Sequence, residues 1–126
     1  MSKRKGSIYE RELLAQFHER GFSGVRVAGS GSSQFPSPDL VVGKDARVFA
    51  VEVKATRKKS VYVANEQLTQ LMLFAKNFGC TPLIGVKFIG FGWRFFPPHI
   101  NVEKKLTRFC KQDSTIDHEN VCAYEG

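Results

Sequence analysis

The segment Arg47–Lys54 constrains the fold more than any other part of this 126-residue chain. Four of its residues belong to types that favour β-structure: Val48, Phe49, Val51 and Val53. Because side chains two positions apart on a strand share a face, Glu52 and Lys54 point to the same side. Charges in a strand that otherwise reads as buried are costly unless they are paired or bound to a metal. The segment therefore predicts an inner strand that carries functional groups.

The rest of the chain alternates between helical and extended patterns. Apolar periodicity predicts a helix over 7–20 that Gly21 closes, and a second over 65–78 with Asn65 as N-cap and Gly79 just past its end. Five segments are predicted as strands: 22–27, 39–42, 47–54, 82–88 and 92–96. The order α-β-β-β-α-β-β predicts an α/β fold in which a central mixed sheet is flanked by helices.

The length of the chain suits one domain over residues 1–126, with 97–126 as a less clearly patterned extension in which 102–110 could form a basic helix. No apolar run approaches the roughly 18–20 residues of a membrane span, and no apolar signal core follows the basic N-terminus. The three cysteines and three histidines are scattered, which argues against a disulfide framework or a zinc site. The protein is therefore expected in the cytoplasm, associated with the nucleoid, and no organic cofactor is expected.

The charge balance indicates a polyanionic partner. Nineteen Lys and Arg residues against twelve Asp and Glu residues give a formal charge of +7, and nucleic acid is the usual partner of such a surface. The basic residues form three clusters: Lys3 to Lys5; Arg57, Lys58 and Lys59; and Lys104 and Lys105 with Arg108 and Lys111. Any one cluster could be only a solvated face, but the first two flank the carboxylates described next.

Pro38-Asp39 precedes Glu52-Val53-Lys54 by a spacing that suits two antiparallel strands joined by a turn at Gly43 to Asp45. Two carboxylates and an ammonium group would then converge. Oxygen ligands without nearby His or Cys select Mg²⁺, with Mn²⁺ as a substitute. Such a site suits phosphodiester cleavage, in which Lys54 offsets charge in the transition state. The alternative is an ordinary polar pattern, since Glu-x-Lys is common on exposed strand faces.

The first helix offers a third carboxylate. Glu10 continues the apolar stripe of Leu13 and Leu14 that must face the sheet, whereas Glu12 lies about 200° away around the helix axis and is expected to face solvent. Glu10 is therefore chosen as the site residue. Its alternative role is a favourable charge in the first helical turn.

These motifs occur in an ordered set that resembles a known family. The matching segments are Lys5-Gly6 with Glu10-Arg11-Glu12-Leu13, Gly21-Phe22 to Arg26 and Gly29-Ser30, Pro38-Asp39-Leu40, Glu52-Val53-Lys54, Tyr62-Val63, Gly79 with Pro82, Gly85 to Phe88, and Gly92 to Phe95. Over about residues 3–96 the chain resembles the archaeal Holliday-junction resolvases. Those enzymes belong to the PD-(D/E)xK nucleases, which share the restriction endonuclease fold.

The resemblance implies a homodimer that recognises four-way DNA junctions by shape and makes paired, metal-dependent nicks in opposing strands during recombination and repair. It assigns the metal to Glu10, Asp39 and Glu52, and catalysis to these three with Lys54 and Ser30. Ser32 is an alternative to Ser30. The residues expected to contact DNA are Lys5, Arg11, Arg26, Arg57, Lys58 and Lys59.

Two other functions fit the residues themselves. One is a repair or restriction-type nuclease of the same fold that cuts duplex DNA, and the other is an architectural junction-binding protein without catalysis. The aromatic residues of segment 88–96 also allow two interpretations, a shared dimer interface or an ordinary core strand.

Overall fold

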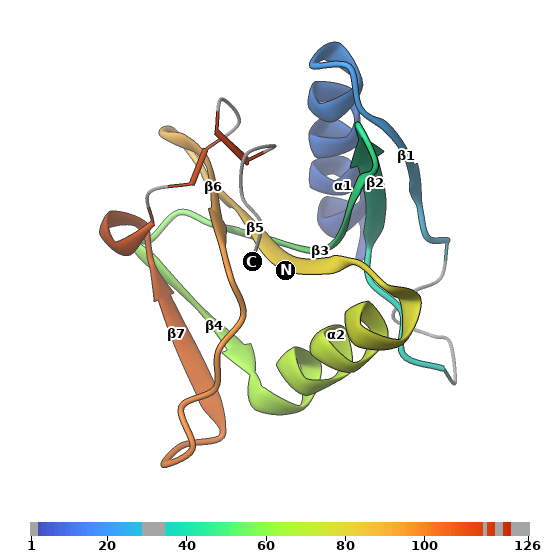
Figure 1. Cartoon of the computed structure of the whole chain (residues 1–126). Coiled ribbons are helices and arrows are strands. Elements are labelled where there is room, and N and C mark those ends of the chain that lie inside the picture. Colours follow the sequence, from blue (N-terminus) through green and yellow to red (C-terminus); the bar gives the residue numbers. More distant parts are fainter. Residues whose placement is uncertain (1–2, 29–34, 115, 118–119, 122–126) are drawn as a thin grey trace.

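A five-stranded mixed sheet passes between two helices in the computed structural model, which describes residues 3–28, 35–114, 116–117 and 120–121 (Figure 1). The sheet has the order β1-β2-β3-β5-β6, and only the β3–β5 pair is parallel. The elements are α1 (Lys3–Glu19), β1 (Ser23–Arg26), β2 (Leu40–Lys44), β3 (Arg47–Thr56), β4 (Ser60–Ala64), α2 (Asn65–Phe78), β5 (Thr81–Phe88), β6 (Gly92–Phe96), β7 (Leu106–Cys110) and the 3₁₀ turn η2 (Lys111–Asp113). The predicted α/β fold is confirmed. Neither α-helix is long and apolar enough to cross a membrane, as judged on the described residues.

Strand β3 lies at the centre because its two faces serve two cores. Val51 and Val53 are buried against the α1 side, together with Leu13 and Phe17 of that helix. Ala50 faces the other way, into a second core built on three residues of α2: Leu68, Leu71 and Ala75. The strand therefore reads as almost continuously apolar, as expected for a strand covered on both faces.

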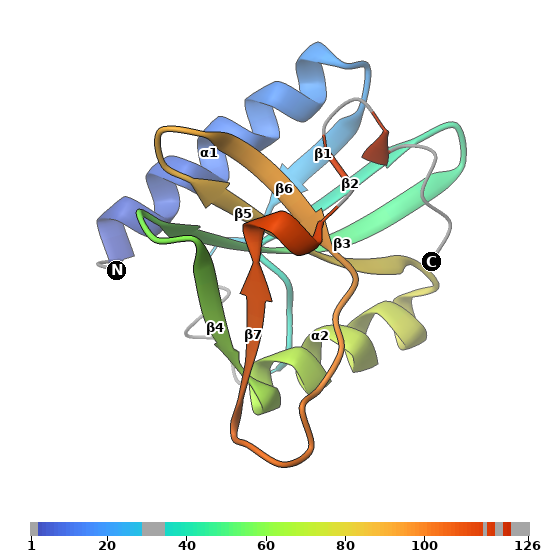
Figure 2. The ribbon, with the colours of Figure 1, turned by 90° about the vertical axis from the view of Figure 1, so that its left-hand side faces the viewer.

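A second, two-stranded sheet forms from β4 and β7, which pair antiparallel beside α2 (Figure 2). The prediction of a basic helix over 102–110 is wrong, and neither strand of this ribbon was predicted. Thr107 and Phe109 are buried while Leu106 and Arg108 are exposed, a period of two that a strand requires. Residues beyond position 97 thus supply a core aromatic residue and the partner strand of β4.

The start of α2 also differs from its prediction. Ala64 is the N-cap and caps with no side-chain hydrogen bond. The Asn65 side chain instead donates to the carbonyl oxygens of Asn101 and Lys104, at 3.0 and 2.7 Å, and accepts from the Thr107 hydroxyl at 2.7 Å. Asn65 therefore ties the helix to the β6–β7 segment. The predicted end is confirmed, because Gly79 has a φ of 85° and its N–H donates to the carbonyl of Ala75.

The aromatic residues of segment 88–96 belong mostly to the core. Phe88, Trp93, Phe95 and Phe96 are all buried. Phe91, in the turn between β5 and β6, is 51% exposed. The core-strand interpretation of this segment is therefore confirmed, and the shared-interface interpretation is set aside.

Candidate active site

Asp39 and Glu52 are neighbours across the β2–β3 pair. Leu40 pairs with Val51, so the same register places Asp39 opposite Glu52 one step earlier. The Asp39 N–H donates to the Val51 carbonyl at 3.1 Å, and the Val53 N–H donates to Asp39 Oδ2 at 2.8 Å. With only 8% of its surface exposed, Asp39 is held in place at the end of β2. The predicted convergence of these two carboxylates is present.

The turn that sets this register differs by one step from the predicted one. Residues Asp45 and Ala46 form it, with positive φ of 53° and 66°, while Gly43 and Lys44 remain in β2. Positive φ at both central residues is the geometry of the two-residue hairpin turns that match strand twist. The tight turn keeps β2 in register with the first half of β3, from Arg47 to Val51.

Glu52 has a strongly perturbed acidity. The pKa of its carboxyl is raised from 4.5 to about 7, first by burial and then by the negative charge of Asp39. Glu10 raises this pKa further, whereas Lys54 lowers it. A carboxyl titrating near neutrality beside a second carboxylate is typical of functional sites.

Lys54 lies on the same face, as predicted. Its Nζ is 3.7 Å from Glu52 Oε2 and donates to Gln67 Oε1 at 3.3 Å. Gln67 lies in the first turn of α2, which follows β4. Gln67 was not predicted as a site residue, because a glutamine in a helix is uninformative until β4 brings that helix back beside β3.

Glu10 reaches the same region from α1. Its Oε1 is 3.2 Å from Nη1 of Arg26, and its side chain is 15% exposed. Burial and then the charge of Asp39 raise the pKa of Glu10, while Arg26 and Arg11 lower it. The choice of Glu10 as the residue that faces the site is consistent with this placement.

The expectation for Glu12 is wrong. Its Oε2 accepts from Lys87 Nζ and from Trp93 Nε1, each at 2.8 Å, and its side chain is 34% exposed. The long side chain reaches back to β5 and β6, which helical periodicity alone does not reveal. Glu12 therefore fastens α1 to the sheet.

The structure describes some of the remaining predicted site residues and not others. Ser30 and Ser32 lie outside the described residues, and of Lys5 only the backbone, within α1, is described. Arg11 is exposed on α1. Arg57, Lys58 and Lys59 are exposed in the turn between β3 and β4, which begins three residues after Lys54. This basic turn therefore extends the surface that begins at the carboxylates.

The donor set fits a hard cation by chemistry, although the geometry is not a preformed cage. In the described part of the chain, no three or more His, Cys, Asp or Glu side chains are arranged to hold a metal ion. Glu10 is engaged with Arg26, which leaves the cross-strand pair Asp39 and Glu52. Mg²⁺ typically binds through one or two carboxylates, with water and substrate phosphates completing the shell.

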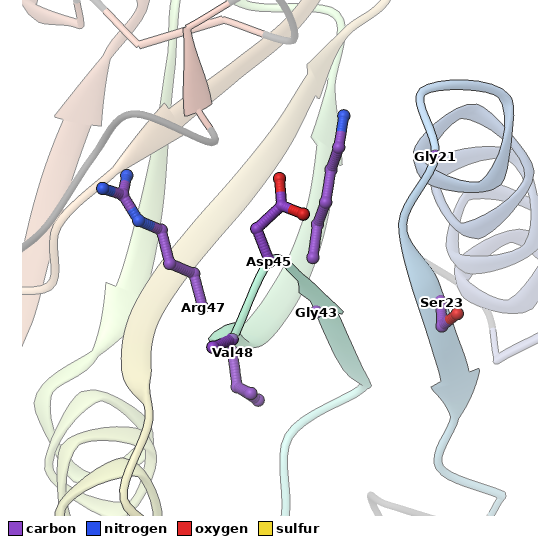
Figure 3. A pocket seen from close by; sticks show the side chains of 8 residues that line it. Gly21, Ser23, Gly43, Asp45, Arg47 and Val48 are labelled. Carbon is purple, nitrogen blue, oxygen red and sulfur yellow. The ribbon is translucent and has the colours of Figure 1, made fainter.

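The hollow shown in Figure 3 lies elsewhere, at the other end of β2 and β3. Gly21, Ser23 and Gly43 line it, together with residues 44–48 of the β2–β3 hairpin. None of its lining residues is one of the candidate site residues. The carboxylate site is therefore separate from this hollow.

The comparisons with known proteins agree on one family. The sequence model of the archaeal Holliday junction resolvases (Hjc) matches residues 1–123. The crossover junction endodeoxyribonuclease Hjc of Archaeoglobus fulgidus is 41% identical over 95 residues, which cover 75% of this chain and 70% of that protein. The crossover junction endodeoxyribonuclease of Sulfolobus islandicus rod-shaped virus 1 is 33% identical over 89 residues, covering 68% and 74% of the two chains.

The fold agrees with the sequence. The solved structure of Archaeoglobus fulgidus Hjc, a Holliday junction resolvase, matches with a TM-score of 0.77 and 35% identity, covering 83% of this chain and 86% of that one. The sequence and the fold thus point to the same relatives, and the chain belongs to the archaeal Holliday junction resolvase (Hjc) family.

Proposed function

We propose that this protein is a divalent-metal-dependent endonuclease that resolves four-way DNA junctions as a homodimer, with Asp39, Glu52 and Lys54 at the centre of its active site. Membership of the resolvase family supports the junction as substrate. The single observation that carries the catalytic part is the register of β2 and β3, which sets Asp39 opposite Glu52 with Lys54 on the same face. An architectural DNA-binding protein has no need of two adjacent carboxylates, because carboxylates repel phosphate.

Asp39 and Glu52 would hold Mg²⁺, and Glu10 would join them as a third ligand by exchanging its ion pair with Arg26 for the metal. The ion, when bound, would supply Lewis-acid polarisation of the phosphate and acidify a bound water. Its positive charge would also offset the repulsion that raises the pKa of Glu52. Metal binding is therefore expected to release a proton near neutral pH.

Lys54 would contact the scissile phosphate. Its ammonium group is held 3.3 Å from Gln67 Oε1 and 3.7 Å from Glu52, so it is oriented before DNA arrives. A fixed positive charge beside the reacting phosphate stabilises the charge that develops in the transition state. Arg57, Lys58 and Lys59 would then contact phosphates farther along the same strand, outside the reacting group.

The decisive experiment uses a labelled immobile four-way junction and a matching linear duplex, each with Mg²⁺ or EDTA, and compares the wild type with Glu52→Gln. Paired nicks that are selective for the junction, require Mg²⁺ and are lost in Glu52→Gln are expected. Equal cutting of both DNAs would instead favour a duplex nuclease of the same fold. Tight junction binding without cutting under any divalent metal would favour the architectural alternative.

Helix α2 would form the interface of the homodimer. Leu73 and Phe78 on this helix are 49% and 59% exposed, and Phe78 stacks on Phe74 with ring centroids 5.0 Å apart. Leu73, Phe74 and Phe78 line one hollow together with Pro36 and Asn77. Exposed apolar side chains gathered in this way suit a self-complementary interface about a twofold axis. The two sites of such a dimer could cut opposing strands of one junction.

Leu73→Glu tests this interface by size-exclusion chromatography with light scattering. The variant is expected to run as a monomer that still binds magnesium but makes unpaired nicks. Leu106→Glu, which alters an equally exposed residue on β7, is the matched control and should leave the dimer intact. A Leu73→Glu protein with unchanged mass would move the interface elsewhere.

A further inference from the structure

The turn between β5 and β6 presents an aromatic ring among cations. Phe91 is 51% exposed. The Arg94 guanidinium carbon lies 4.6 Å from its ring centroid, and Lys111 Nζ lies 4.2 Å from it. The neighbouring aromatic residues of this hairpin are buried, so a ring that stays half exposed with two cations close to it needs an explanation beyond core packing.

The backbone holds this ring in a defined place. The Phe91 N–H donates to the Phe88 carbonyl at 2.8 Å, and Gly90 and Gly92 have positive φ of 89° and 135° that side chains rarely adopt. The ring therefore projects from a tight turn whose shape the two glycines permit. It is positioned by the fold and does not depend on a long loop.

The same turn lies beside the active-site strand. The Ile89 N–H donates to the Thr56 carbonyl at 2.9 Å, and Thr56 is two residues beyond Lys54 on β3. Two residues of strand span roughly 7 Å, about the rise of two base pairs of DNA. A DNA strand that runs from the carboxylates over the end of β3 would therefore reach the ring within a few nucleotides.

The cations near the Phe91 ring are continuous with the basic turn that is expected to contact DNA. The Lys111 N–H donates to the Lys59 carbonyl at 2.8 Å, so η2 and the basic turn Arg57 to Lys59 are bound together. Arg94 and Lys111 then extend this positive surface to Phe91. An unstacked base with its adjoining phosphates is the charge-complementary partner of an apolar ring that has two cations beside it.

We propose that Phe91 contacts an unstacked base at the branch point of the junction, while Arg94 and Lys111 contact the adjoining phosphates. This inference rests on the proposed function, because an intact duplex keeps its bases stacked. A base at a branch point is easier to unstack, so the contact would favour junction over duplex. Phe91 would thus contribute to substrate selection and take no part in the chemical step.

The experiment measures binding in Ca²⁺ to a four-way junction with 2-aminopurine at the branch point, and to the matching duplex. Phe91→Ala should weaken junction binding about tenfold or more, the size of a lost base–aromatic stack, and leave duplex binding within about twofold. It should also remove the fluorescence change of 2-aminopurine that the wild type produces. Phe91→Trp should retain both effects, and Leu106→Ala, at a residue 47% exposed, serves as the matched control.

The salt dependence separates the ring from its cations. Arg94→Ala and Lys111→Ala should each reduce the slope of log affinity against log salt by about one, whereas Phe91→Ala should not change it. Unchanged junction affinity in Phe91→Ala, or an equal loss on both DNAs, would overturn the inference. Cleavage of the junction by the wild type with Mg²⁺ is assayed alongside. If the wild type cuts the junction and Phe91→Ala binds it normally, only the role of Phe91 is refuted. Loss of junction binding in that variant, without cleavage by the wild type, would refute only the proposed function.

Discussion

The backbone N–H of Val53 donates a hydrogen bond of 2.8 Å to Oδ2 of Asp39. Val53 lies between Glu52 and Lys54 in β3, so this bond fixes the Asp39 carboxylate at the level of both residues. One oxygen accepts from the backbone, and the carboxylate keeps capacity to bind further groups. The bond makes the position of Asp39 a property of the sheet itself.

Substitutions of Asp39 should separate this structural bond from catalysis. Asparagine retains an oxygen that accepts from the Val53 N–H, so Asp39→Asn should fold with nearly unchanged stability and lose cleavage. Alanine leaves that buried N–H unpaired, which costs about 1–3 kcal/mol in the free energy of unfolding. Urea denaturation and a junction-cleavage assay measure the two effects. Residual cleavage by Asp39→Asn near the wild-type rate would remove Asp39 from the metal site.

The raised pKa of Glu52 should make stability depend on pH. Because the folded state holds its proton up to about pH 7 and the unfolded state only to about 4.5, folding binds a proton between these values. The stability gained from this proton is present below pH 4.5 and is lost as the pH rises through 7. Glu52→Gln does not titrate and should therefore become more stable than the wild type in alkaline buffer.

Between pH 4 and pH 8.5, the free energy of unfolding of Glu52→Gln should rise relative to that of the wild type by about 3 kcal/mol, from 1.36 kcal/mol per pKa unit. Urea denaturation of both proteins in EDTA measures it, and the titrating groups that do not interact with Glu52 cancel in the difference. Added Mg²⁺ should remove much of the difference at pH 8.5. A gap between the proteins that does not vary with pH would mean that Glu52 titrates normally.

Lys54 and Gln67 should differ in the size of their effects. Lys54→Ala removes a charge next to the reacting phosphate and should lower the cleavage rate by about 10²–10³. Gln67→Ala removes only the hydrogen bond that orients Lys54, and should lower the rate by about fivefold, equivalent to one ordinary hydrogen bond. Gln70→Ala, on the exposed side of α2, is the matched control. Single-turnover cleavage measures all three, and equal losses at Gln67 and Gln70 would contradict the positioning role.

The two glutamates of α1 should behave oppositely. Glu10→Gln should lower cleavage about tenfold, as loss of a residue supporting a metal site does, with little change in stability. Glu12→Ala should cost about 1–3 kcal/mol in stability, because the indole N–H of buried Trp93 loses its acceptor. Cleavage by Glu12→Ala, measured well below its melting temperature, should remain within about twofold. A large loss of cleavage there would bring Glu12 into the catalytic machinery.

The sequence predicted the site because its residues are close along two paired strands. Asp39, Glu52 and Lys54 are related by the β2–β3 hairpin, so strand periodicity and a short turn were enough to bring them together. Helical periodicity likewise placed Glu10 on the side of α1 that faces the sheet. Such local relationships depend on few elements, and each has its own pattern in the sequence.

The parts that were missed depend on contacts between distant segments. Strand β7 pairs with β4 across more than 40 residues, and the basic residues in and around it obscured an alternation that becomes clear only from burial. Asn65 looked like a helix cap because its other partners, Asn101 and Thr107, follow much later in the chain. Gln67 had no distinguishing signal at all.

Strand β3 carries Glu52 and Lys54, and it pairs with β2 over Arg47 to Val51 and with β5 over Phe49 to Thr56. The amide hydrogens of residues 49–51, which have a partner strand on both sides, should therefore exchange with solvent only when the whole molecule opens. Glu52 and Lys54 follow directly after this protected segment and should lose their arrangement only when it unfolds. Cleavage activity and native structure should therefore be lost at the same temperature on heating, without an intermediate that is folded but does not cleave DNA.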